Sequence, residues 1–281
     1  MERADIMPKV ESFDKKKIIF IGNSFTFFGK CVSGKSLGGV DNGYFYELAR
    51  SFGDDVTVTD FTWGGASFWH KGDGYAPRML YEKIKELHPA YYNNPQGLPI
   101  DSFYLQDVAV LQQSGDSINE TYEDARLIME LFPPETVFGF YITTYDAFHS
   151  FEPSFEAARR IRDEHNGVYI PLGHLINDII KKEVVLENSL FEYDKNSFVV
   201  CREHDKFHPN TLTGYLTALC VYSAFTQKEL LSADHSFVRG MDKKEFYSLG
   251  DTNHHEIIAS DSEMLALKRL VYEYCVKYNN F

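Results

Sequence analysis

Cysteine and long apolar runs are both scarce in this sequence. The four cysteines lie far apart, without the Cys-x-x-Cys spacing of zinc sites: Cys31, Cys201, Cys220 and Cys275. Neither a zinc cluster nor a disulfide framework is indicated, and we expect buried free thiols. The strongest apolar run, from Ile18 to Ile21, stops at Gly22, well short of the roughly 18 residues that a membrane span needs. We therefore expect a soluble protein without a membrane partner.

Positive charge is also scarce, since 28 Lys and Arg stand against 41 Asp and Glu, for a formal net charge of −13. A nucleic-acid surface normally has a clustered cationic face, and the basic runs Lys15–Lys17 and Lys181–Lys182 are too short to outweigh this acidic field. Nucleic acid is therefore not an expected partner. The first eight residues, Met1–Pro8, lack the apolar stretch and small-residue cleavage site of a secretory signal, which predicts a cytoplasmic protein.

Apolar runs alternate with segments of helical periodicity, which predicts an α/β fold whose parallel strands are joined by helices. Five buried strands are expected at Lys17–Gly22, Val56–Phe61, Val108–Gln112, Val137–Thr143 and Val168–Leu172. Six apolar helix faces are expected at Phe45–Phe52, Leu80–Leu87, Ala125–Phe132, Phe155–Ile161, Leu212–Leu219 and Met264–Tyr274. With 44% hydrophobic residues, the chain can bury one core. We predict a single domain, 1–281, with a core at about 17–226 and a C-terminal extension, 227–281, packed on it.

One motif points toward nucleotide binding, because Gly29–Ser36 matches the phosphate-loop pattern Gly-x-x-x-x-Gly-Lys-Ser. Its context argues against that function. A phosphate loop leaves a strand directly and runs into a helix, whereas here residues 23–28 intervene before it and the following segment, Leu37–Gly43, is too rich in glycine for a helix. Nucleotide binding is therefore the weakest of the functions that the sequence suggests.

A serine follows the first predicted strand in Ile21-Gly22-Asn23-Ser24-Phe25-Thr26. Open α/β sheets bind ligands at this carboxyl edge, but a single serine there is more often a helix cap than a nucleophile. Near the other end, Asp205-x-x-His208 precedes a helix that begins around Pro209. A histidine titrates near ~6.5 and can take the serine proton while Asp205 holds its tautomer, although a capped helix start explains the same pattern.

Candidate oxyanion donors follow two further strands. Gly65 comes after the second strand, and Gln112 and Gln113 end the third. If the strands are parallel, the backbone N–H groups of Ser24 and Gly65 and a side-chain amide of Gln112 or Gln113 can converge on a developing oxyanion. Each feature alone has a structural explanation, and their joint occurrence on successive strand ends favours acyl transfer.

These blocks resemble the SGNH hydrolases, also called GDSL esterases and lipases, over roughly Lys17–Thr226. Gly22-Asn23-Ser24 is similar to the first block, with Asn23 where Asp is commoner, and Ile-Gly-Asn-Ser-Phe-Thr is similar to a branch of largely uncharacterised bacterial members. The resemblance implies Ser24 as nucleophile, Gly65 as oxyanion glycine, and Asp205 and His208 as the rest of the triad. It also implies a flavodoxin-like three-layer α/β/α sandwich.

The third block departs from the family, because Leu111-Gln112-Gln113-Ser114 replaces the usual Gly-x-Asn-Asp. Gln112 is the candidate replacement, and some carbohydrate-esterase branches resemble this sequence in having glutamine there. The change leaves open whether Gln112 or Gln113 completes the oxyanion hole.

The leading hypothesis is a serine esterase that hydrolyses short-chain, acetyl-type esters through an acyl-enzyme, with a small-molecule substrate such as an acylated carbohydrate. The alternative is a non-catalytic carbohydrate-binding protein on the same scaffold. Asn23, His70 and Gln113 are candidate substrate contacts, and the insertion Pro89–Pro99 either lines the cleft or is a surface loop. No cofactor is expected and no metal, because the cluster around His204 lacks a third ligand motif. The oligomeric state stays open.

Overall fold

The computed structural model describes the chain in several stretches, and all structural statements below refer to these. They are residues 8–23, 26, 43–62, 66–67, 78–79, 106–113, 121–142, 152–186, 193, 197–198, 209–236 and 260–279. The predicted helix at Leu80–Leu87, the Gly29–Ser36 motif and the insertion Pro89–Pro99 lie outside them.

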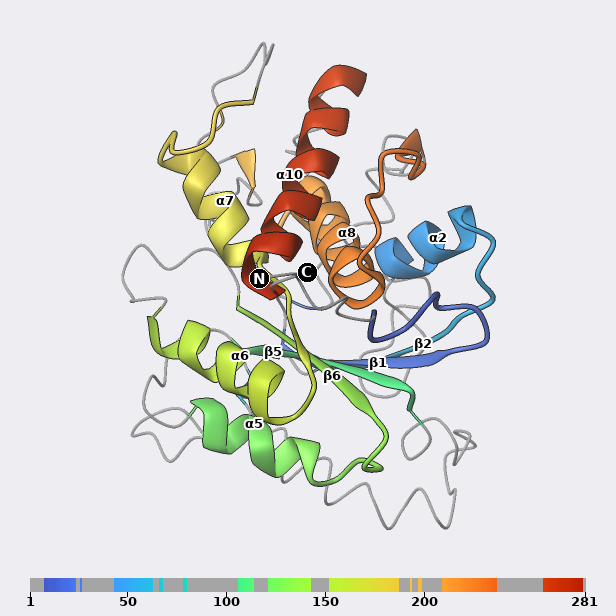
Figure 1. Ribbon diagram of the computed structural model, residues 1–281, viewed down its shortest axis with the longest axis vertical. Helices are drawn as coiled ribbons and strands as arrows, with labels where there is room; N and C mark the ends of the chain where they lie inside the picture. Colours follow the sequence, from blue (N-terminus) through green and yellow to red (C-terminus); the bar gives the residue numbers. More distant parts are fainter. Residues whose placement is uncertain are drawn as a thin grey trace, which may run out of the picture.

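A five-stranded parallel sheet forms the centre of the fold (Figure 1). Its strands are β1 (Lys17–Gly22), β2 (Thr57–Thr62), β5 (Val108–Gln113), β6 (Val137–Ile142) and β7 (Val168–Tyr169). They are arranged in the order β2-β1-β5-β6-β7, which is the flavodoxin-like order. A separate two-stranded sheet pairs β3 (Ala66–Ser67) with β4 (Arg78–Met79). The five predicted strands and their parallel arrangement are therefore confirmed.

The last strand is shorter than predicted. Tyr169 is its final residue, and helix α7 (Leu172–Ile180) begins where the predicted strand ends. Ile170 still donates its backbone N–H to the Phe140 carbonyl at 3.0 Å, but Pro171 has no N–H with which to continue the ladder. The prediction of a strand through Leu172 was wrong for this reason, and α7 was not predicted at all.

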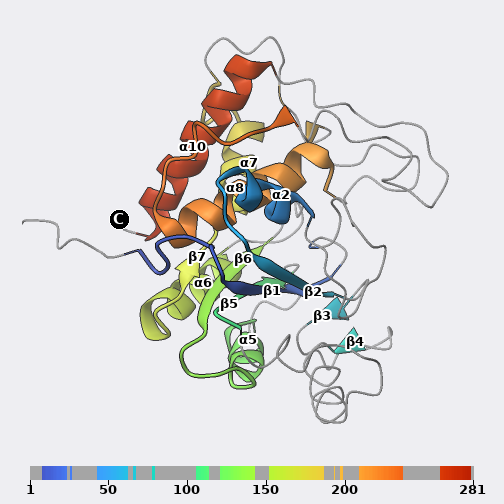
Figure 2. The same cartoon turned by 90° about the vertical axis from the view of Figure 1, so that its right-hand side faces the viewer.

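Helices cover both faces of the sheet, giving three layers (Figures 1 and 2). Helices α5 (Thr121–Met129) and α6 (Glu152–Glu164) lie on one face. The other face carries α2 (Gly43–Ser51), α7, α8 (Thr211–Thr226) and α10 (Asp261–Asn279). Five of the predicted helix faces thus fall on observed helices, with Phe52 and Phe132 just beyond the ends of α2 and α5. The predicted three-layer α/β/α architecture is confirmed.

Strand alternation divides the core into two apolar clusters. Ile18 and Phe20 of β1 join Val108 and Val110 of β5 in the cluster that includes α2 and α8. The intervening residues, among them Ile19 and Leu111, join the cluster under α5 and α6. Because successive strand residues point to opposite faces, these near-continuous apolar runs fill both clusters at once.

Two of the four cysteines are described, and both are buried with free thiols. Cys220 lies in α8 and Cys275 in α10, where the Cys275 thiol lies 3.7 Å from the Cys220 carbonyl oxygen. They pack α10 against α8 as small apolar groups. None of the helices in the described stretches is both long and apolar enough to cross a bilayer.

Candidate active site

The carboxyl ends of β1 and β5 meet at the point where the strand order reverses. The chain passes from β1 to β2 on one side and later returns to place β5 on the other side of β1. In open α/β sheets this switch point leaves a crevice at the carboxyl ends of the strands, and ligands bind there. Asn23 and Gln112 occupy these two strand ends.

The carboxamide of Gln112 is held in one orientation by two hydrogen bonds. Its Oε1 accepts from the backbone N–H of Asn23 at 3.1 Å and from the hydroxyl of Thr26 at 2.9 Å. A backbone N–H can only donate, so the atom that faces it is the oxygen and not the nitrogen. The NH₂ group of Gln112 therefore points away from both contacts.

That NH₂ group is a buried hydrogen-bond donor at the switch point of the sheet. Gln112 is only 1% exposed, and its Nε2 has no hydrogen-bond partner in the part of the chain that the structure describes. Leaving a buried donor unsatisfied costs about 1–3 kcal/mol. Such a group is expected where a ligand or transition state supplies the acceptor.

Gly22 makes room for these contacts. A Cβ at this position would lie 2.2 Å from Thr26 Oγ1 and 2.6 Å from Gln112 Oε1. The register of the sheet, with Ile21 opposite Leu111, sets Gly22 beside Gln112. Any side chain on residue 22 would occupy the position of the Thr26–Gln112 hydrogen bond.

The turn after β1 is closed by its own backbone. The N–H of Thr26 donates to the Asn23 carbonyl at 2.9 Å, a spacing typical of a β-turn. Asn23 and Thr26 are both buried. Ser24 lies between them in the sequence, outside the described residues.

Helix α8 begins at the same edge of the sheet and runs antiparallel to the strands. Gly214, in its first turn, packs against the ring of Tyr44 so closely that a Cβ would lie 2.5 Å from it. Tyr44 is in the first turn of α2, which descends from the carboxyl end of β1 toward the start of β2. At the other end of α8, the Phe225 carbonyl accepts from the backbone N–H of Val10, which precedes β1.

The start of α8 is tightly fixed. Asn210 caps the helix through Oδ1, which accepts from the Thr213 N–H at 3.1 Å, and its Nδ2 donates to the Ser197 carbonyl at 2.8 Å. The Asn210 N–H and the Thr213 hydroxyl both donate to the Phe198 carbonyl, at 3.2 and 2.6 Å. The residues that flank segment 199–209, Phe198 and Asn210, are therefore hydrogen-bonded to each other at the start of α8.

Of the predicted site residues, the structure brings together Asn23 and the side chain of Gln112. Five others lie outside the described residues, namely Ser24, Gly65, His70, Asp205 and His208, and the side chain of Gln113 is also not described. Thr26 was missed as a site residue. The sequence shows a small hydroxyl residue two positions after the candidate nucleophile, but the local pattern does not indicate its contact with Gln112.

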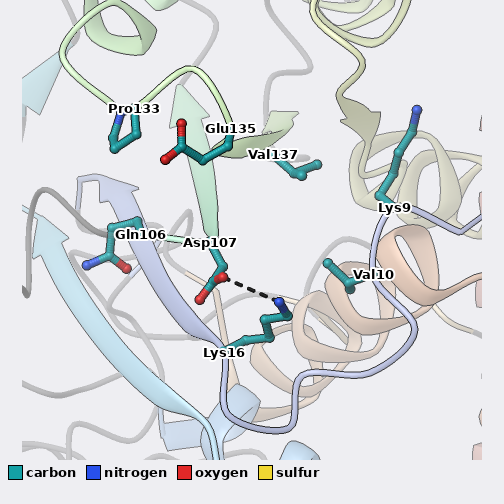
Figure 3. Close-up of a pocket in the computed structure, with 8 residues that line it drawn as sticks. All are labelled: Lys9, Val10, Lys16, Gln106, Asp107, Pro133, Glu135 and Val137. Carbon is teal, nitrogen blue, oxygen red and sulfur yellow. Dashed lines mark hydrogen bonds and ion pairs between the residues drawn. The ribbon is translucent and has the colours of Figure 1, made fainter.

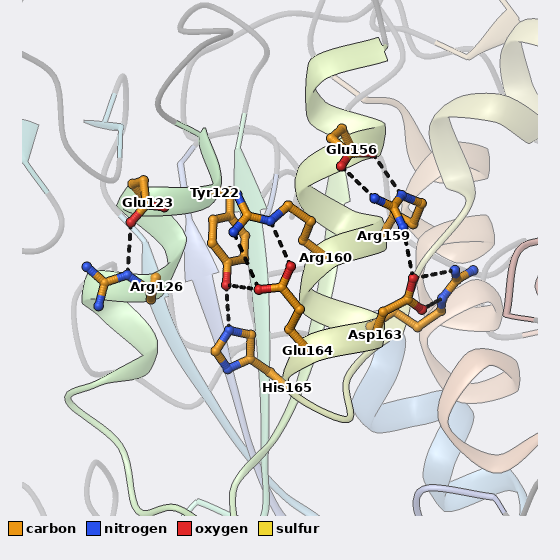
Figure 4. A network of polar contacts seen from close by, with 10 residues as sticks. Tyr122, Glu123, Arg126, Glu156, Arg159, Arg160, Asp163, Glu164 and His165 are labelled. Atoms are coloured by element: carbon orange, nitrogen blue, oxygen red, sulfur yellow. Dashed lines mark hydrogen bonds and ion pairs between the residues drawn. The ribbon is translucent and has the colours of Figure 1, made fainter.

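A second polar network lies away from this edge, between α5 and α6 (Figure 4). The Tyr122 hydroxyl donates to the Glu164 carboxylate at 2.8 Å, and His165 Nε2 lies 2.8 Å from the Tyr122 hydroxyl oxygen. Arg160 lies 3.5 Å above the Tyr122 ring and pairs with Glu164 at 2.9 Å. Burial, followed by the bond to Glu164, raises the pKa of Tyr122. These groups satisfy one another, so the network joins two helices and offers no reactive group.

A cavity of about 380 Å³ opens at the opposite, amino edge of the sheet (Figure 3). Lys16 and Asp107 pair across it at 3.4 Å, and the Asp107 carboxylate also accepts from the Lys17 backbone N–H at 2.8 Å. Charges of both signs line this cavity, and the central pair, Lys16 and Asp107, bind each other. Within the described stretches, no group of three or more His, Cys, Asp or Glu residues is placed to hold a metal ion.

Comparisons with known proteins identify the fold. No family model matches the sequence, and no curated protein matches it significantly. Among solved structures, a candidate GDSL-like lipase from Parabacteroides merdae ATCC 43184 is 15% identical, covers 78% of this chain and 99% of its own, and superposes with a TM-score of 0.50. A carbohydrate acetylesterase family member from Sinorhizobium meliloti is 12% identical over 75% of this chain and 100% of its own, with a TM-score of 0.41. The chain has the three-layer α/β/α fold of the SGNH, or GDSL, hydrolases.

Proposed function

We propose that this protein is a serine esterase that cleaves short-chain acyl esters through a Ser24–His208–Asp205 triad. The observation that carries the proposal is the Gln112 carboxamide, which is buried at the switch point with its oxygen bound and its NH₂ group without a partner among the described residues. A donor held in this way without an acceptor suits an oxyanion that exists only during reaction.

The position of Gln112 favours it over Gln113 as the third oxyanion donor. Strand alternation puts Gln112 on the same face as Val108 and Val110, which pack against α2 and α8. The bond from the Asn23 N–H ties it to the residue immediately before Ser24. The amide thus contacts the residue that precedes the proposed nucleophile in the sequence, on the face of the sheet that α2 and α8 cover.

The proposed base would approach from α8. Residues 199–209 contain Asp205 and His208, and hydrogen bonds at Phe198 and Asn210 hold both ends of this segment at the helix start. Because that start lies at the carboxyl edge, His208 is two residues in sequence from Asn210, which is held at this edge. This supports a histidine within reach of Ser24.

In the proposed reaction Ser24 Oγ attacks the ester carbonyl carbon while His208 takes the hydroxyl proton. Negative charge develops on the carbonyl oxygen, where the Gln112 Nε2–H and the backbone N–H groups of Ser24 and Gly65 would stabilise it. The C–O bond then breaks, and the leaving alkoxide takes the proton from His208. Water repeats the sequence on the acyl-enzyme and releases the acid, while Asp205 keeps His208 oriented.

The acyl group is proposed to be short, with an acetylated carbohydrate as the substrate class. This rests on the resemblance of the glutamine-containing third block to carbohydrate-esterase branches of the superfamily. Hydrolysis of p-nitrophenyl acetate and of acetylated sugars, compared with long-chain esters, tests the choice through kcat/KM. A preference for long chains would contradict it.

The nucleophile is tested by reacting wild type and Ser24→Ala with a fluorophosphonate. We expect labelling and p-nitrophenyl acetate hydrolysis in the wild type and neither in the variant, with both proteins folded by circular dichroism. Sugar binding without labelling or turnover in the wild type would instead favour the carbohydrate-binding alternative. Magnesium-dependent ATP binding lost in Lys35→Ala would favour the nucleotide-binding alternative.

A further inference from the structure

Thr26 is one of two donors that set the orientation of the Gln112 carboxamide. Its hydroxyl donates to Oε1 at 2.9 Å, and the Asn23 backbone N–H supplies the other bond. A carboxamide oxygen has two lone pairs, and these two donors occupy both. The contact is buried, with Thr26 7% exposed and Gln112 1% exposed, so water does not readily replace it.

The two donors differ in what they can enforce. The Asn23 N–H alone favours the oxygen-inward orientation, but a single hydrogen bond leaves the amide free to pivot about it. The Thr26 hydroxyl adds a second point, which fixes the plane of the amide and hence the direction of Nε2–H. Stabilisation of an oxyanion depends on donors already aimed at the place where charge develops.

Thr26 is itself held by the turn that follows β1. Its N–H donates to the Asn23 carbonyl at 2.9 Å, so the two residues that donate to Gln112 Oε1 are also joined to each other. A shift of this turn would therefore move both donors together and rotate the Gln112 amide.

We infer that Thr26 is a positioning residue, whose hydroxyl aims the Gln112 Nε2–H at the oxyanion and couples it to the turn that bears Ser24. The inference rests on the proposed esterase function. Thr26 touches neither substrate nor the reacting atoms in this scheme, and its effect on turnover passes through Gln112.

The matched variants are Thr26→Val, which keeps the shape and removes the hydroxyl, and Thr26→Ser, which keeps the hydroxyl. We expect Thr26→Val to lower kcat for p-nitrophenyl acetate by about 5- to 10-fold, with KM within about 2-fold of wild type. Thr26→Ser should recover at least half of the lost rate. Normal kcat in Thr26→Val, or a change confined to KM, would overturn the inference.

The decisive test combines Thr26→Val with Gln112→Ala. If Thr26 acts through the amide, its replacement should change kcat by less than about 2-fold once Gln112 is alanine. An equal loss in both backgrounds would mean that Thr26 acts independently of Gln112 and would overturn the inference. Thermal unfolding of all four proteins shows whether any loss of kcat comes from unfolding.

The NMR signals of the Gln112 side chain test the role of Thr26 without measuring turnover, so this test does not depend on the esterase function. The side-chain NH₂ signals of Gln112 in a ¹H–¹⁵N spectrum can be assigned by their loss in Gln112→Ala. We expect Thr26→Val to shift or broaden them and Thr26→Ser to leave them near wild type. A wild type that neither hydrolyses the ester nor reacts with the fluorophosphonate would overturn the proposed function, while unchanged Gln112 signals in Thr26→Val would overturn the role of Thr26.

Discussion

Buried polar side chains lie at both edges of the central sheet, and two of them, Asp54 and Gln112, differ in which of their polar atoms are hydrogen-bonded. At the amino edge, Asp54 is 8% exposed, and its carboxylate accepts from the Phe13 N–H at 3.0 Å and from the Tyr222 hydroxyl at 2.8 Å. Asp107 likewise accepts from the Lys17 N–H. At the carboxyl edge, the hydrogen bonds that Gln112 makes to described residues all go to its side-chain oxygen.

This difference separates polar groups that hold the fold from the one that we propose to take part in the reaction. Asp54 links the segments that precede β1 and β2, and Asp107 links the first residue of β1 to the residue before β5, through hydrogen bonds that are already made in the resting protein. In the Gln112 amide, the oxygen makes the hydrogen bonds that orient the side chain, and the NH₂ group has no partner among the described residues. Substitutions at the amino edge should therefore change stability, and substitutions at the carboxyl edge should change turnover.

The largest effect is expected for Asp205→Asn. If Asp205 orients His208, the amide should favour the wrong tautomer and lower kcat by about 10³–10⁴, while the free energy of unfolding stays near that of wild type. Steady-state hydrolysis of p-nitrophenyl acetate and urea unfolding measure the two quantities. An active Asp205→Asn would remove Asp205 from the triad.

Gly22→Ala should disrupt the contacts at the carboxyl edge, because the added methyl group would clash with Thr26 and Gln112. The new Cβ would lie 2.2 Å from Thr26 Oγ1 and 2.6 Å from Gln112 Oε1, so the hydrogen bond between them must break. We expect kcat to fall by about 10² or more.

Gly53→Ala at the amino edge is the matched control, because its Cβ would meet nothing within 4 Å although its φ is +87°. That strain should cost about 1 kcal/mol of stability without changing kcat. Similar kcat in the two variants would contradict the comparison.

The sheet could be predicted from the sequence because its strands are continuous apolar runs that fill both core clusters. The boundary at Pro171 was misplaced since Val168–Leu172 is apolar throughout, and only the missing proline N–H marks where the ladder stops. The contact between Thr26 and Gln112 was beyond sequence reasoning for another reason. It depends on the register that sets Ile21 opposite Leu111, and local patterns contain no information about register between strands so far apart in the chain. The triad remains a prediction.

Asp54→Ala is the counterpart of Asp205→Asn at the amino edge. It leaves the Phe13 N–H and the Tyr222 hydroxyl without their acceptor in a buried site, which should lower the free energy of unfolding by roughly 2–3 kcal/mol. In the folded protein kcat should stay within about 2-fold of wild type, since no described contact links Asp54 to the carboxyl edge. Urea unfolding and ester hydrolysis below the unfolding midpoint check both statements. A large loss of kcat with normal stability would remove the distinction between the edges.

Acid pH offers the last way to separate stability from turnover, because two histidines would respond to it. Burial lowers the pKa of His174 to about 4, whereas an unfolded histidine titrates near ~6.5. Below ~6.5 the unfolded chain takes up a proton that the native protein does not, so this contribution to stability is complete above ~6.5 and is lost as the pH falls toward ~4. The loss between pH 7 and pH 5 should be about 2 kcal/mol. Protonation of His208 in the same range would instead lower kcat while the protein stays folded.

His174→Phe should separate the two responses. The imidazole is stacked on Tyr278 with ring centroids 4.5 Å apart, and phenylalanine preserves that stacking without a titrating group. We expect the variant to lose about 2 kcal/mol less stability than wild type between pH 7 and pH 5 in urea unfolding. The pH dependence of kcat in the folded protein should be unchanged, because in the proposed mechanism it follows the protonation of His208. A variant whose stability still falls as steeply as that of wild type would show that His174 is not the group that takes up the proton on unfolding.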